Sequence, residues 1–158
     1  MLVLIQAHKG RSFFSRLIKW FTRSEYSHIS TWFVQEAVVI ESREGKGVIE
    51  RSSTLFQEAI LKGVISVYKF DITEEQKEQM LREMRETLGK KYDWLHVSKF
   101  ITRRRGSSDD RWFCSEHFLH HAQSARVSIL NMDPWLADPG HIVRSPNVTK
   151  LTLSEIPL

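Results

Sequence analysis

The chain has 158 residues, of which 41% are hydrophobic and 27% charged, a composition typical of a globular protein rather than a disordered one. Its length predicts one domain over 1–158, with a core large enough to be stable without disulfides. The single cysteine excludes an intrachain disulfide framework and a cysteine-rich zinc site. Because 23 basic residues face 19 acidic ones, mostly interspersed, the net charge of +4 is a weak signal, and we expect no nucleic-acid partner.

The N-terminal segment has an apolar run of only five residues and no positively charged leader, so it does not resemble a signal peptide. No apolar run approaches the ~20 residues that a bilayer span needs. We therefore expect a protein that is cytoplasmic as encoded and does not insert stably into a membrane, with export by another route left open. The sequence does not indicate an oligomeric state.

The hydrophobic pattern places strands early in the chain and helices later, which predicts an α+β fold with an antiparallel sheet. Strands are expected over 2–7, 28–34, 37–42, 48–50, 64–70 and, as an edge strand, 148–153. Helices are expected over 12–23, 53–61, 73–88, 94–102 and 113–124.

The helix predicted over 12–23 has apolar residues at helical spacing beside a basic rim. The rim consists of Lys9, Arg11, Arg16, Lys19 and Arg23. This pattern is typical of a helix that turns its apolar stripe to the core, and also of a helix that lies on a lipid surface. We expect the core-facing arrangement.

Cys114 stands where an amphipathic helix begins, and a helix N-terminus favours the thiolate, the nucleophilic form of cysteine. A nucleophile needs a base, and His28 on a predicted strand is the best candidate. Glu41 ends a β-branched run on the strand expected to pair with that of His28, within cross-strand reach of the imidazole. We therefore expect a Cys-His-Glu arrangement, with Asp93 as an alternative orienting group.

Three further histidines, His117, His120 and His121, lie on the helix expected to follow the cysteine. Two of them are four residues apart and would share a helix face, but no His-Glu-x-x-His order or further carboxylate accompanies them. We interpret them as a polar helix face, and we expect no metal. The chain also lacks a glycine-rich phosphate loop, and we expect no cofactor.

Four short motifs follow one another along the chain in the order histidine, acid, Tyr-Asp, cysteine. They are Tyr26-Ser27-His28-Ile29-Ser30, Val39-Ile40-Glu41-Ser42, Gly89-Lys90-Lys91-Tyr92-Asp93-Trp94 and Phe113-Cys114-Ser115-Glu116. This order resembles the circularly permuted NlpC-like branch of the papain-like superfamily and, within it, the YiiX/YebB-like group. The resemblance spans roughly residues 1–125.

The resemblance implies a papain-like, barrel-like antiparallel sheet packed on the nucleophile helix. It also implies that Cys114 attacks an acyl carbonyl, that His28 acts as base and then acid, that Glu41 orients His28, and that Tyr92 contacts substrate or oxyanion. The implied activity is that of a cysteine peptidase or amidase cleaving a peptide or peptidoglycan fragment. Two alternatives stay open: a lipid acyl hydrolase or acyltransferase of the lecithin retinol acyltransferase type, and a non-catalytic ligand-binding module.

Overall fold

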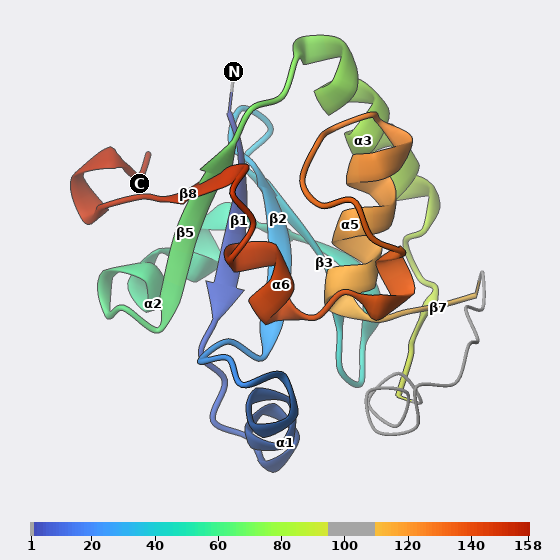
Figure 1. The fold of residues 1–158 in the computed structure, drawn as a ribbon. Coiled ribbons are helices and arrows are strands. Elements are labelled where there is room, and N and C mark those ends of the chain that lie inside the picture. Colours follow the sequence, from blue (N-terminus) through green and yellow to red (C-terminus); the bar gives the residue numbers. More distant parts are fainter. Residues whose placement is uncertain (1, 95–109) are drawn as a thin grey trace.

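The computed structural model describes residues 2–94 and 110–158, and it combines helices with a large antiparallel sheet, as the α+β prediction required (Figure 1). Six strands form this sheet in the order β4-β3-β2-β1-β5-β8. They are β1 (Val3–His8), β2 (His28–Phe33), β3 (Val38–Arg43), β4 (Gly47–Ser52), β5 (Ile65–Phe70) and β8 (Val148–Lys150). The central position of β1 and β2 places the histidine strand inside the sheet.

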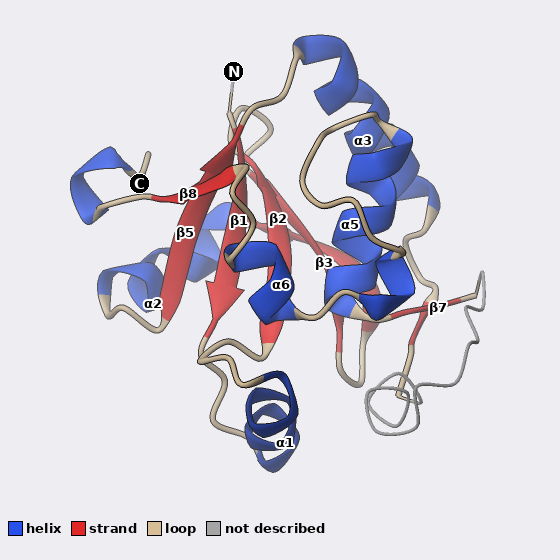
Figure 2. Ribbon diagram, in the orientation of Figure 1, coloured by secondary structure: helices blue, strands red, loops and turns tan. Residues whose placement is uncertain are grey.

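Helices cover both faces of the sheet, with α3 and α5 packed side by side on one of them (Figure 2). The α-helices are α1 (Phe13–Thr22), α2 (Gln57–Leu61), α3 (Glu74–Glu86), α5 (Cys114–Ser124) and α6 (Pro139–Val143). Short 3₁₀ helices are η1 (Ser53–Phe56), η2 (Pro134–Leu136) and η3 (Leu153–Glu155). Among the described helices, none has the length and apolar character that crossing a bilayer requires.

The core lies on both sides of β1, because successive side chains of a strand point to opposite faces. Val3 and Ile5 join the larger core, which α3 and α5 cover. Leu4 points the other way and packs with Phe56 and Ile60 of the η1–α2 segment. Burial on both faces explains why the first strand is a continuous apolar run rather than an alternating one.

A second, two-stranded parallel sheet pairs β6 (Lys91–Tyr92) with β7 (Arg111–Trp112). A backbone hydrogen bond joins it to the main sheet: the Val48 N–H donates to the Lys90 carbonyl at 2.9 Å. Gly47 has φ +76°, and a β-carbon there would collide with that carbonyl oxygen. This close approach of two backbones carries Tyr92 and the segment before Cys114 toward β3 and β4.

Most predicted elements are present, with boundaries displaced by a few residues. The expected helix over 53–61 is split into η1 and α2, and the expected strand over 148–153 ends at Lys150. It does lie at an edge of the sheet, beside β5. The helix expected over 94–102 lies outside the described residues from position 95 onward.

Candidate active site

His28 and Glu41 lie on neighbouring strands of the main sheet and are hydrogen-bonded to each other. The β2–β3 register pairs Thr31 with Ile40, so that Glu41 comes opposite Ser30, two residues from His28 and on the same face. The distance between His28 Nε2 and Glu41 Oε2 is 2.6 Å. The cross-strand reach expected from the sequence is therefore present in the structure.

The Glu41 carboxylate is only 2% exposed, and its two oxygens face different cationic partners. One oxygen bonds His28, and the other is 3.1 Å from Arg51 Nη1. Burial alone would raise the pKa of Glu41, but the hydrogen bond and charge of His28, with a smaller contribution from Arg51, lower it to about 2. Glu41 is consequently an ionised, fixed acceptor at neutral pH.

Cys114 is the first residue of α5, as expected from the sequence, and its side chain is buried. The segment before Cys114 is hydrogen-bonded to β3, the strand of Glu41, because Ser42 Oγ donates to the Trp112 carbonyl at 2.6 Å. Burial lowers the pKa of His28, but the hydrogen bond and charge of Cys114, followed by those of Glu41, outweigh it and raise the pKa to about 10. The imidazole thus interacts with the sulfur and with the carboxylate, and it is cationic at neutral pH.

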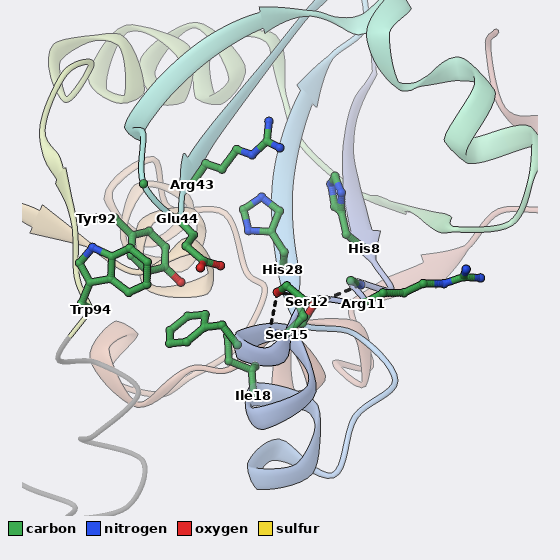
Figure 3. A pocket seen from close by; sticks show the side chains of 14 residues that line it. His8, Arg11, Ser12, Ser15, Ile18, His28, Arg43, Glu44, Tyr92 and Trp94 are labelled. Atoms are coloured by element: carbon green, nitrogen blue, oxygen red, sulfur yellow. Dashed lines mark hydrogen bonds between the residues drawn. The ribbon is translucent and has the colours of Figure 1, made fainter.

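A groove of about 510 Å³ opens beside these residues, between α1 and the loop that follows β3 (Figure 3). Figure 3 shows His28, Tyr92 and Glu44 directed into this space from different elements. Tyr92 also belongs to the small apolar cluster that contains Cys114. Burial, and then the charge of Cys114, raise the pKa of Tyr92 well above its usual value, so its hydroxyl remains a hydrogen-bond donor.

His8 is a site residue that the sequence reasoning missed. It is paired with His28 in the β1–β2 register, and the two rings are 4.8 Å apart between centroids. Its Nε2 lies 2.9 Å from Ser30 Oγ. Burial and the charge of His28 lower the pKa of His8 to about 3, so it is a neutral neighbour of the cationic histidine. Only its place at the end of the first strand could have indicated this.

His8, His28 and Glu41 offer three potential metal-ligand atoms within 4.8 Å of one another, a group the sequence analysis did not anticipate. Two imidazoles and a carboxylate are a ligand set typical of zinc or non-haem iron. The chemical types of these three side chains fit such an ion. In the arrangement described, however, a proton joins His28 to Glu41, and a cation bound between them would have to replace it.

The interpretation of the α5 histidines as a polar helix face is wrong for two of them. His117 and His121 are buried and pack around the Trp112 ring, with centroids 5.5 Å from it in each case. His117 Nε2 also lies 2.8 Å from Thr87 Oγ1. These rings serve the contact between α5 and its neighbours, while His120 is exposed.

The described fold is similar to that of a solved structure, the "metalloprotein yiiX from Escherichia coli O157:H7, DUF1105". The two share 19% sequence identity with a TM-score of 0.73, and the match covers 96% of each chain. At this identity the likeness establishes a YiiX-like fold and nothing finer. No protein-family model matches the chain, and no curated protein does.

Proposed function

We propose that this protein is a cysteine hydrolase with Cys114 as nucleophile, His28 as proton carrier and Glu41 as the residue that positions His28. The observation that carries the proposal is the 2.6 Å hydrogen bond from His28 to a buried carboxylate, on a histidine that also interacts with Cys114. Cys114 would contact His28, and His28 contacts Glu41, which is the order of nucleophile, base and orienting acid that hydrolysis by a thiol requires. The YiiX-like fold supports a permuted papain-like arrangement, in which both strands precede the nucleophile helix.

In the first half of the reaction, the Cys114 thiolate attacks the carbonyl carbon of an amide, and the carbonyl oxygen becomes an oxyanion. The Cys114 N–H is at the first position of α5, where a backbone donor has no partner within the helix. This N–H and the Tyr92 hydroxyl are the proposed oxyanion donors. As the tetrahedral intermediate collapses, His28 gives its proton to the leaving amine, and a thioester remains on Cys114.

In the second half, a water molecule enters from the groove and attacks the thioester carbonyl. The now neutral His28 takes a proton from that water, while Glu41 holds the ring and balances the imidazolium charge. The carbon–sulfur bond then breaks, so that the acid product leaves and the thiolate–imidazolium pair is restored. Charged and hydroxyl side chains line the groove, which suits a peptide or peptidoglycan fragment as substrate. They include Arg11, Ser12, Arg43 and Glu44.

Trapping of the acyl-enzyme tests this proposal directly. The protein is mixed with an activated p-nitrophenyl ester, quenched in acid and measured as an intact protein and as peptides. Because Cys114 is the only cysteine, we expect one acyl group on the peptide that contains it and none in Cys114→Ala. Acylation of another residue, or no acylation of the folded protein, would contradict the proposal.

A second candidate function, a divalent-cation centre, uses His8, His28 and Glu41. It is favoured by the 4.8 Å grouping of their ligand atoms and by the description of the similar YiiX structure as a metalloprotein. His8 separates the two functions, because it has no role in the proposed hydrolysis. If the site holds a metal, titration with Zn²⁺ should show binding that His8→Gln abolishes. If the site is purely hydrolytic, His8→Gln should leave acylation of Cys114 nearly unchanged.

A further inference from the structure

Helix α1 exposes two large aromatic side chains, although part of its apolar stripe is buried. Phe13 is 82% exposed and Trp20 is 73% exposed. They are seven residues apart and therefore lie on the same side of the helix. Ile18 is buried in the Cys114 cluster, with Leu17 packed against it. The apolar stripe is thus wider than its contact with the protein, and its outer edge lies uncovered.

Basic side chains border this uncovered edge. Residues 11–24 include four basic residues and no acidic one, while Lys9, just before them, pairs with Glu25 at 3.0 Å. At the helical repeat, Arg16 and Lys19 lie next to Trp20 around the helix, on the side of Trp20 opposite Leu17. A hollow of about 520 Å³ at the end of α1 is lined by Lys19, Trp20, Phe21 and Arg23. Cations beside exposed aromatic rings complement a negatively charged surface with an apolar layer beneath it.

We propose that α1 docks this protein on an anionic phospholipid surface. Trp20 and Phe13 enter the boundary between headgroups and acyl chains, and the neighbouring basic side chains meet lipid phosphates. Tryptophan is suited to this boundary because its ring has an apolar body and a polar N–H. In Figure 1, α1 projects from one end of the molecule, below the sheet, where a flat surface can reach it.

The inner side of the same helix forms a wall of the groove, through Phe14, Ser15 and Ile18. Docking through the outer side therefore places the groove close to the lipid surface. If the proposed hydrolysis is correct, this position favours substrates that a membrane presents, such as a lipid-linked peptide or an acyl lipid. Docking itself does not depend on the chemistry of Cys114, so Cys114→Ala should bind lipid as the wild type does.

Sedimentation with vesicles tests the docking. We expect the wild type to bind vesicles of equal parts phosphatidylcholine and phosphatidylglycerol, and to be released by salt. Neutralising Arg16 and Lys19 in the double variant Arg16→Gln/Lys19→Gln should lower the affinity roughly 25-fold, or about fivefold for each charge. Trp20→Ser should weaken binding, and brominated acyl chains should quench less tryptophan fluorescence in Trp20→Phe than in the wild type.

Matched control variants change exposed side chains elsewhere. Leu55→Ser removes an exposed apolar side chain from η1, and Arg82→Gln removes an exposed charge from α3. Both controls should bind vesicles like the wild type, and circular dichroism should show all variants folded. Three results would overturn the proposal: no vesicle binding at low salt, equal binding to pure phosphatidylcholine, or unchanged binding by the α1 variants. A failure of docking would leave the acylation test of Cys114 unaffected.

Discussion

Helices α1 and α5 both contribute to the cluster around Cys114, but they are held in the protein very differently. In α5, eight of eleven residues are buried, whereas in α1 two of ten are. The helix that carries Cys114 is thereby held over most of its surface, as precise positioning of the proposed nucleophile requires. The helix that forms the groove wall keeps an exposed face. In the two proposals made above, hydrolysis and lipid docking thus belong to separate helices.

The largest effect should come from removing the proposed nucleophile on α5. Cys114→Ala should lower the hydrolysis of a soluble activated ester by about 10⁴-fold, because the thiolate has no substitute. Trp20→Ser on α1 is the matched control, and it should hydrolyse the same soluble ester at the wild-type rate. Release of p-nitrophenol measures both. If Trp20→Ser lost as much activity as Cys114→Ala, the separation of roles between the helices would be wrong.

A smaller loss is expected when Glu41, the residue proposed to position His28, is changed. Glu41→Gln keeps the shape of the side chain but removes the charge, and should lower turnover about 10²-fold. Because the Glu41 hydrogen bond and charge help to raise the pKa of His28, that pKa should fall below its value of about 10 in the variant. A titration of His28 followed by NMR checks this. Glu50→Gln on β4 is the control, and an equal fall in both variants would exclude a specific role for Glu41.

A change at the contact between the small sheet and the main sheet should affect stability more than hydrolysis. Gly47→Ala introduces a β-carbon against the Lys90 carbonyl at a positive φ, and we expect the free energy of unfolding to drop by about 3 kcal/mol. Gly45 has a similar φ of +73°, but a β-carbon there meets no described atom within 4 Å. Gly45→Ala should therefore cost only about 1 kcal/mol. Equal losses on urea unfolding would mean that the close approach to Lys90 adds nothing.

The smallest effect concerns acid stability on the buried side of α5. Burial and the charge of His120 lower the pKa of His121 to about 4, and burial also lowers the pKa of His117 well below its usual value. Below about pH 6.5 the unfolded chain binds protons that the folded one does not, so stability decreases as the pH falls toward 4. The shift at His121 should lower the free energy of unfolding by about 1–2 kcal/mol by pH 5.

His121→Phe tests this origin of the acid sensitivity, because it keeps a ring against Trp112 but cannot be protonated. Urea unfolding of this variant should depend less on pH between about 6.5 and 4 than unfolding of the wild type. His141→Gln serves as the control, since His141 is exposed and lies on α6 rather than beside His121. An unchanged pH dependence in His121→Phe would assign the acid sensitivity to other groups.

The sequence predicted the features that depend on local pattern or on strand alternation. Strand β2 and the start of α5 follow from periodicity, and the closeness of His28 to Glu41 follows from two neighbouring strands with side chains on one face. These inferences succeeded because few long-range contacts enter them.

Features set by contacts between distant segments were missed. His8 is beside His28 only through the β1–β2 register, and the two-residue strands β6 and β7 are too short to have a period. The burial of His121 depends on Trp112, which reaches it through the packing of β7 on α5. The exposure of Trp20 could likewise not be predicted from the sequence, because an apolar stripe on a helix does not show how much of its width the core will cover.

The most direct test of the central claim is the alkylation rate of Cys114 by iodoacetamide across pH, in the wild type and in His28→Ala. We predict a wild-type rate that stays high well below pH 8.5, the approximate pKa of a free thiol, and a variant whose rate falls off near that value. Only Cys114 can react as a thiol, since the chain has no other cysteine. Identical profiles near the free-thiol value in both proteins would contradict a thiolate–imidazolium pair, and with it the proposed hydrolase.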